Sequence, residues 1–127
     1  MWIKWRNFEG DFLIRQETRK TKMEDFVHLH VHTYYSILDG QSSIQRLVDK
    51  AIANGMGGMA LTDHGNMFGT KEFFNYCKKV NAKRKEEGLP AFKPIIGCEM
   101  YVARHHKTDK VKENGDMSGY HLIVLAK

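Results

Sequence analysis

Short apolar runs alternate with segments of helical period along this chain, and that alternation constrains its fold more than any other feature. Four runs are predicted as strands: residues 26–31, 58–62, 94–102 and 122–126. Two amphipathic segments between them are predicted as helices: residues 43–54 and 70–87. Repeated strand–helix–strand order builds parallel sheets through right-handed crossovers. We therefore predict an α/β fold, either an open doubly wound sheet or a barrel. A closed barrel of seven or eight units needs about 200 residues or more, so in that case these 127 residues would be its first half.

The segment 43–54 has the clearest helical pattern. Its apolar positions are Ile44, Leu47, Val48, Ala51 and Ile52. This i, i+3, i+4, i+7, i+8 stripe predicts one face packed against the sheet. Ser42 and Gln45 have the spacing of a capping box, and Gly55 stands where a glycine commonly ends a helix.

The remaining segments also have predicted faces or partners. Alternation in the first run places Val27, Leu29 and Val31 on one face and Phe26, His28, His30 and His32 on the other. The second helix should turn inward Phe73, Phe74, Cys77 and Val80, and end at Gly88 and Pro90. The polar stretch 104–119 is expected to be a loop, because it has no apolar period. The last run should pair with 94–102 and leave an uncovered parallel edge, which is an aggregation hazard.

Composition and charge are those of a globular protein. Hydrophobic residues make up 42% and charged residues 28%, which suits a packed core, and the net charge of +5 is a mild bias toward anionic partners. No stretch reaches the roughly 18 apolar residues that cross a bilayer, and the N-terminus has no leader pattern. We therefore expect a cytoplasmic location, with reduced thiols at Cys77 and Cys98. Residues 1–22 have no sustained period and are expected to form an extension before a folded unit that begins at Met23.

Histidines and carboxylates collect near the predicted carboxyl ends of the strands. They are His30 and His32 in and after the first run, Asp39 in the loop that follows, Asp63 and His64 after the second run, and Glu99 late in the third. In α/β folds these ends meet at one edge of the sheet, so we predict that the three histidines and Glu99 converge there. Imidazole nitrogens and carboxylate oxygens are donors for zinc, manganese and iron. The pattern predicts a metal site.

Several of these residues also have a purely structural interpretation. A single histidine in a strand is more often a packed or surface residue than a ligand, and Asp63 can simply cap the loop that follows it. Glu99 is different, because a buried carboxylate must be paired and its own strand offers no lysine or arginine beside it. His105 and His106 lie in a lysine-rich loop and are expected on the solvated surface.

Separated blocks of this sequence resemble a known family. The blocks are HLHVHT (28–33) followed by SILDG (36–40), then LTDHGNMFG (61–69), KPIIGCEMYVA (93–103) and YHLIVLAK (120–127). The order and the amino-acid sequences of these blocks resemble those of the polymerase and histidinol phosphatase (PHP) domain at the N-terminus of the bacterial DNA polymerase III alpha subunit. The resemblance runs from Met23 to Lys127, as the N-terminal part of such a domain, and does not cover residues 1–22.

The resemblance implies a distorted (βα)7 barrel, similar to a TIM barrel, with up to three divalent metal ions (Zn, Mn or Fe) held by nine ligands. By motif, the ligands in this chain would be His30, His32, Asp39, His64, Glu99 as the bridging carboxylate, and His121 at the start of its apolar run. The other three would lie beyond Lys127. No catalytic residue separate from these ligands, and no other cofactor, is expected.

The implied activity is metal-dependent phosphoester hydrolysis, as a 3′ to 5′ proofreading exonuclease that acts on the primer 3′ end of DNA. The full protein would carry out DNA-directed DNA synthesis through later domains, and its partners would include a sliding clamp or a separate proofreading subunit. Two alternatives stay open: a free-standing phosphatase of the same superfamily, and a noncatalytic docking module braced by metal. Residues 1–127 by themselves are expected to be poorly soluble or oligomeric and without appreciable phosphoesterase activity.

Overall fold

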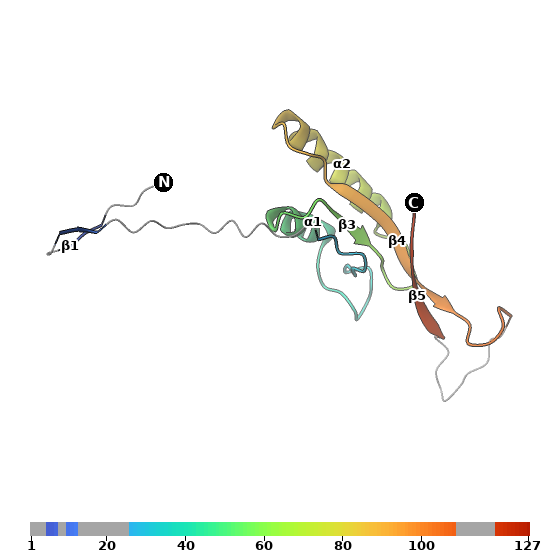
Figure 1. Cartoon of the computed structure of the whole chain (residues 1–127). Coiled ribbons are helices and arrows are strands. Elements are labelled where there is room, and N and C mark those ends of the chain that lie inside the picture. Colours follow the sequence, from blue (N-terminus) through green and yellow to red (C-terminus); the bar gives the residue numbers. More distant parts are fainter. Residues whose placement is uncertain (1–4, 8–9, 13–25, 109–118) are drawn as a thin grey trace.

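The computed structural model describes residues 5–7, 10–12, 26–108 and 119–127. Its elements are β1 (Trp5–Asn7), β2 (Gly10–Phe12), α1 (Ile44–Ala53), β3 (Gly58–Leu61), α2 (Thr70–Glu86), β4 (Lys93–Val102) and β5 (Tyr120–Leu125) (Figure 1). β1 and β2 pair antiparallel, in a stretch for which the sequence predicted no element. A second sheet has the strand order β3-β4-β5. Within the described ranges, no helix is long and apolar enough to cross a membrane.

The three-stranded sheet combines parallel and antiparallel pairing. β3 and β4 pair parallel and are connected through α2, as predicted, with Gly58 opposite Lys93 and Leu61 opposite Ile96. β5 pairs antiparallel with β4, so the prediction of a further parallel strand is wrong. A parallel return needs a crossover, usually a helix, and the described loop residues 103–108 after β4 contain none. β5 therefore starts beside the end of β4; the rest of the predicted loop, 109–118, lies outside the described residues.

The first predicted strand lies beside β3, but its pairing is interrupted and it forms no strand. The Ala60 N–H donates to the His28 carbonyl (2.8 Å), and the Thr62 N–H donates to the Val31 carbonyl (2.9 Å). The two donors, Ala60 and Thr62, are two residues apart, whereas the two acceptors, His28 and Val31, are three residues apart. The first segment therefore contains one extra residue, as in a β-bulge. The Val31 N–H donates to the Thr62 hydroxyl instead of a backbone carbonyl. Because the bulge breaks the alternation, Leu29 is 51% exposed and does not face inward as predicted.

Helix α1 has the predicted amphipathic face. Ile44, Val48 and Ala51 are buried, and Leu47 and Ile52 are partly buried against the same cluster. The phase predicted from the apolar stripe is therefore confirmed, although Leu47 lies at the edge of the core.

The two ends of α1 differ in how well the sequence predicted them. The N-cap is Ser43, not Ser42, and its hydroxyl accepts from a backbone N–H of the first turn. Gln45 donates to the Glu72 carboxylate at 2.9 Å, so the predicted capping box is wrong. At the other end, Gly55 has a φ of 81°, in the left-handed region that glycine tolerates best, as predicted for the residue that ends the helix.

Helix α2 buries a narrower stripe than predicted. Phe73 and Cys77 are buried and Val80 is partly buried, but Phe74 is 51% exposed. Adjacent helical residues point about 100° apart, so a helix that packs through one narrow face cannot bury both phenylalanines. Gly88, with a φ of 69°, follows the end of the helix as predicted.

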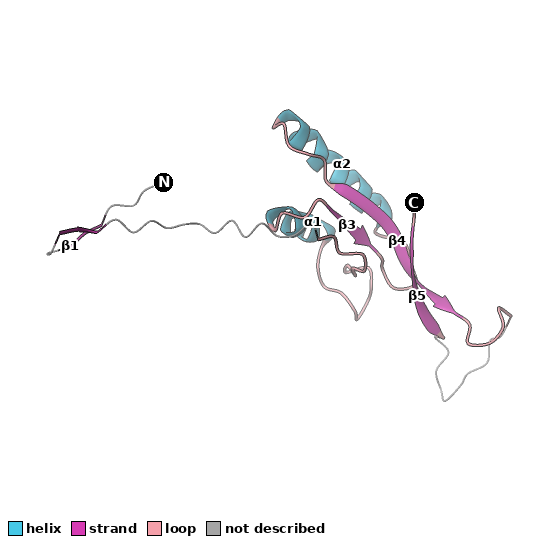
Figure 2. Cartoon of the chain, viewed as in Figure 1, coloured by secondary structure: helices cyan, strands magenta, loops and turns pink. Residues whose placement is uncertain are grey.

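The hydrophobic core joins α1, α2 and β3. Its largest fully buried side chains include Phe73, Phe92, Ile44, Met59 and Leu61. The first half of β4 runs beside α2, and its second half, which pairs with β5, extends away from the two helices (Figure 2). Several apolar side chains of β5 and of this second half of β4 are exposed. The polar residues predicted as ligands lie where this hairpin meets the end of β3.

Candidate metal centre

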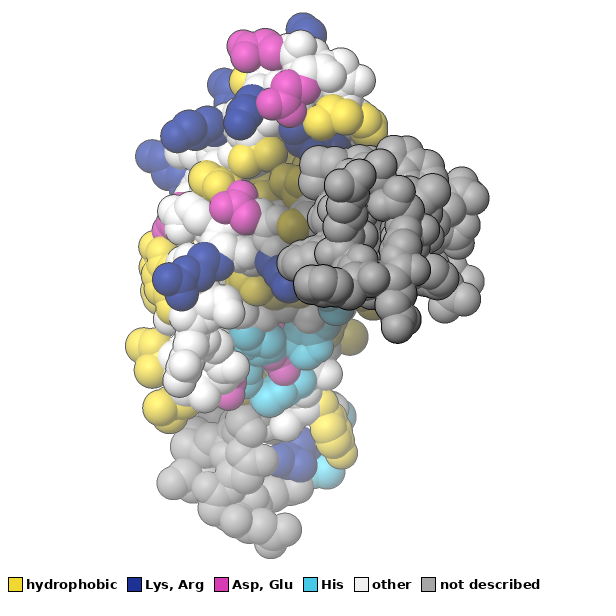
Figure 3. All heavy atoms as spheres, turned by 90° about the vertical axis from the view of Figure 1, so that its left-hand side faces the viewer, with side chains coloured by type: hydrophobic (Ala, Val, Ile, Leu, Met, Phe, Trp, Pro, Cys, Tyr) yellow, Lys and Arg dark blue, Asp and Glu magenta, His cyan; other side chains and the backbone are white. Residues whose placement is uncertain are grey.

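Five parts of the fold deliver the six predicted ligands to one place. His30 and His32 come from the bulged segment beside β3, and Asp39 from the loop that follows it. His64 follows the end of β3 and forms an isolated bridge with Glu99 of β4, and His121 lies in β5. In the space-filling view, histidine side chains gather on one face around an acidic side chain (Figure 3). The predicted convergence of distant residues is confirmed.

Glu99 is the centre of this group, and its side chain is only 8% exposed. Its Oε2 atom lies 3.3 Å from His30 Nε2, 2.8 Å from His32 Nε2 and 3.4 Å from His64 Nδ1. Its Oε1 atom lies 2.8 Å from His121 Nδ1. Burial by itself would raise the pKa of Glu99, but the hydrogen bond to His30 and the charges of His32 and His30 outweigh it and lower that pKa. The carboxylate is thus held in its charged form by the imidazoles around it.

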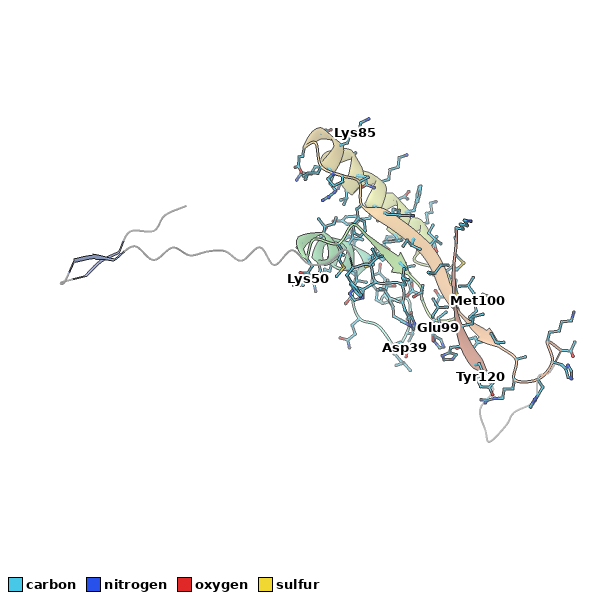
Figure 4. The ribbon with its side chains drawn as sticks, viewed as in Figure 1. Asp39, Lys50, Lys85, Glu99, Met100 and Tyr120 are labelled. Carbon is cyan, nitrogen blue, oxygen red and sulfur yellow. The ribbon has the colours of Figure 1, made fainter. Side chains whose placement is uncertain are left out.

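The donor atoms form two adjacent sets that share one carboxylate. Ligand atoms of His30, His32 and Glu99 lie within 4.8 Å of one another, and so do those of His64, Glu99 and His121. Each set can hold a metal ion. Asp39 adjoins the second set, with its Oδ2 atom 3.6 Å from His64 Nδ1, and in Figure 4 it lies near Glu99, far from Lys85 at the end of α2.

The antiparallel direction of β5 explains the position of His121 at the start of its apolar run. In the register of the hairpin, His121 is opposite Tyr101, and Glu99 is opposite Ile123. His121 and Glu99 are therefore diagonal neighbours on one face, within reach of each other's side chains. A parallel β5 would have placed the start of the strand at the other end of the sheet.

Asp63 is fully buried and holds the loop before α1 in place. Its carboxylate accepts from the Thr33 N–H (2.6 Å), the Thr33 hydroxyl (2.9 and 3.0 Å to the two oxygens) and the Ser36 hydroxyl (2.8 Å). The structural interpretation that Asp63 caps the following loop is therefore wrong, because it binds a loop about 30 residues earlier in the chain. Nothing local in the sequence indicates Thr33 or Ser36 as its partners.

Tyr101 is a neighbour of the site that the sequence interpretation missed. Its hydroxyl is hydrogen-bonded to His64 Nε2, and its ring packs edge-on against His64 and His121 at centroid distances of 5.0 and 5.3 Å. Tyr101 lies two residues after Glu99 in β4, so strand alternation places both on one face. The two-residue period of the strand was therefore the sequence signal that could have identified Tyr101 as a neighbour of the site.

The other described histidines and both cysteines belong to neither donor set. His28 packs edge-on against Phe26, and His105 and His106 are exposed as predicted. Cys77 and Cys98 are both free thiols, as predicted, and burial raises the pKa of the Cys77 thiol to about 11.

Comparison with known proteins places these features in a family. A family model described as the PHP domain matches residues 28–127. The chain is 51% identical over 102 residues to a DNA polymerase III subunit alpha from Treponema pallidum, and 45% identical over 102 residues to one from Chlamydia trachomatis. These two alignments cover 80% of this chain but only 8% and 7% of the relatives' own lengths. A DNA polymerase III subunit alpha from Aquifex aeolicus is 40% identical over 109 residues, which are 82% of this chain and 8% of that relative. Four imidazoles around one buried carboxylate and the match to this family model agree, and the chain belongs to the PHP domain family.

Proposed function

We propose that the six clustered side chains bind divalent metal ions, up to three, of the zinc, manganese or iron class. The six are His30, His32, Asp39, His64, Glu99 and His121. The observation that carries this proposal is the Glu99 carboxylate, whose two oxygens are contacted by histidines from three parts of the chain. Four imidazoles beside one carboxylate are the nitrogen and oxygen donors that these metals prefer.

The shape of the donor set supports more than one ion. Because the two three-residue groups share Glu99 and no other member, that carboxylate can bridge two neighbouring positions. Bound divalent cations would supply charge to stabilise a developing phosphoryl negative charge and would lower the pKa of water toward neutrality. Asp39, beside the second group, adds a further oxygen donor on an exposed loop where a substrate can approach.

From this chemistry we infer a metal-dependent phosphoesterase that acts as a 3′ to 5′ proofreading exonuclease on the primer 3′ end of DNA. The names of the relatives support a place in a DNA polymerase III alpha subunit, whose DNA-directed DNA synthesis would be carried out outside these residues. We further propose a distorted (βα)7 barrel in which residues 23–127 are the N-terminal part. Other replisome subunits, such as a sliding clamp or a separate proofreading subunit, would be partners of the whole protein in the cytoplasm.

The test combines metal binding with hydrolysis in the intact protein that carries these residues. Calorimetric titration with manganese should give binding that the Glu99→Gln variant loses, whereas Glu87→Gln, a surface carboxylate at the far end of α2, should leave it unchanged. With manganese, the intact protein should shorten a primer from its 3′ end, and Glu99→Gln should not.

Other outcomes distinguish the alternatives. Metal binding without hydrolysis of any phosphoester would instead indicate a docking module braced by metal. Cleavage of small phosphomonoesters but not DNA would indicate a phosphatase. Failure of the unmodified protein to bind a divalent cation would overturn the proposal.

A further inference from the structure

Ser36 is a buried residue that contacts three of the six proposed ligands at once. It is only 1% exposed. Its hydroxyl lies 3.0 Å from His32 Nδ1 and accepts from the His64 backbone N–H at 2.9 Å. Its carbonyl accepts from the Asp39 backbone N–H at 3.0 Å. One side chain and one carbonyl thus connect the bulged segment, the loop after it and the end of β3.

The hydrogen bonds around the Ser36 hydroxyl leave only one arrangement of protons. A hydroxyl has a single hydrogen, and Ser36 donates it to the Asp63 carboxylate at 2.8 Å, which can only accept. The His64 backbone N–H can only donate, so it uses one lone pair of the hydroxyl oxygen. The contact to His32 Nδ1 must then be a hydrogen bond that the imidazole donates.

From this geometry we infer that Ser36, oriented by Asp63, is a positioning residue that holds a proton on His32 Nδ1 and so turns Nε2 toward the proposed metal position beside Glu99. His32 Nε2 lies on that side, 2.8 Å from Glu99 Oε2. Hydrogen bonds to the far nitrogen of a metal-binding histidine set its tautomer and ring orientation. The role in metal binding rests on the proposed function, but the proton on Nδ1 does not, because it follows from the hydrogen bonds of Ser36.

The proton on His32 Nδ1 can be detected in the metal-free chain. Long-range proton–nitrogen correlation spectra of histidine-labelled protein report separately whether Nδ1 and Nε2 carry a proton. We expect His32 Nδ1 to be protonated in the unmodified chain. We expect Ser36→Ala to lower the fraction of molecules that carry this proton. A His32 without a proton on Nδ1 in the unmodified chain would overturn the inference without any variant having to fold.

Metal affinity provides the second measurement. Loss of a residue that supports a ligand typically weakens metal binding roughly 10- to 100-fold, so Ser36→Ala should weaken zinc binding, followed by calorimetry, by at least roughly tenfold. Thr62→Val is the matched control, because Thr62 is a fully buried hydroxyl that binds the same segment through Val31 and forms no hydrogen bond with a histidine of the described residues. It should bind zinc within about twofold of the unmodified chain.

The two measurements separate the two proposals. If the unmodified chain binds no zinc but His32 is protonated on Nδ1 through Ser36, the proposed metal site fails and the positioning role stands. If zinc binds and Ser36→Ala changes neither the zinc affinity nor the protonation of His32 Nδ1, the positioning role fails and the metal site stands.

Discussion

The apolar core around Phe73 and the polar end around Glu99 fix their side chains in different ways. In the core, Phe73, Ile44 and Val48 are completely buried, and non-directional packing holds them. At the polar end, Glu99 is almost buried, but the histidine side chains around it stay between 20% and 48% exposed. Their positions depend on directional hydrogen bonds. The comparison indicates that stability is concentrated in one region and ligand geometry in the other.

Loss of a core side chain should have the largest effect, and mainly on stability. Phe73→Ala should lower the free energy of unfolding by about 3–5 kcal/mol, because it removes buried apolar surface and leaves a cavity that the surrounding residues fill only partly. Denaturant unfolding of the metal-free chain measures this. Phe74→Ala, at the exposed neighbouring position, should stay within about 0.5 kcal/mol. Equal losses of unfolding free energy at the two positions would show that α2 packs through a different face from the one described.

Loss of a proposed ligand should have the opposite effect, with a large decrease in zinc affinity and little change in stability. His32→Gln should weaken zinc binding by at least about a hundredfold, beyond the usual cost of losing a residue that only supports a ligand. The unfolding free energy of the metal-free chain should change by less than about 1 kcal/mol, as for other partly exposed positions. His28→Gln is the control, since His28 lies in the same segment but outside the cluster. A comparable decrease in zinc affinity in the His32→Gln and His28→Gln variants would contradict the proposed ligand set.

A residue at the edge of the core should give an intermediate loss of stability. Leu47 is only partly buried, so Leu47→Ala should cost about 1–2 kcal/mol, below the 2–5 kcal/mol of a fully buried leucine or isoleucine. Ile44→Ala, on the same helix but fully buried, should reach that higher range. Thermal or denaturant unfolding of the two variants would show which loses more stability. A larger loss for Leu47→Ala would show that Leu47, and not Ile44, lies deeper in the core.

The smallest effect is expected at the polar end, as a gain in stability. Leu38, next to Asp39, has a φ of 76° and is 100% exposed, so it bears backbone strain without burying its side chain. Asparagine tolerates this left-handed conformation better, and Leu38→Asn should raise the unfolding free energy by about 0.5–1 kcal/mol. Zinc affinity should remain unchanged. A loss of stability would show that Leu38 contributes packing that its exposure does not indicate.

Much of the site could be predicted from short-range patterns. The His-x-His pair, the Asp-His pair and Glu99 each stand at or near the end of an apolar run, and parallel strands bring such ends together. Asp39 belonged to the same pattern, in the loop after the first run, whereas only the family resemblance indicated His121. His121 made structural sense only once the antiparallel direction of β5 was known.

The sequence by itself determined the elements whose formation depends on neighbours within a few turns. These are the buried face and final glycine of α1 and the span of α2. The parallel pairing of β3 and β4 is not local, but it followed from the strand–helix–strand order. Periodicity and capping act locally, so they can be read along the chain. The tertiary structure alone decided the bulge beside β3, the antiparallel return of β5, and the pairing of Ser36 with Asp63 across 27 residues. These depend on which backbone and polar groups meet once the core has formed, since each buried donor and acceptor must then find a partner that no local pattern specifies.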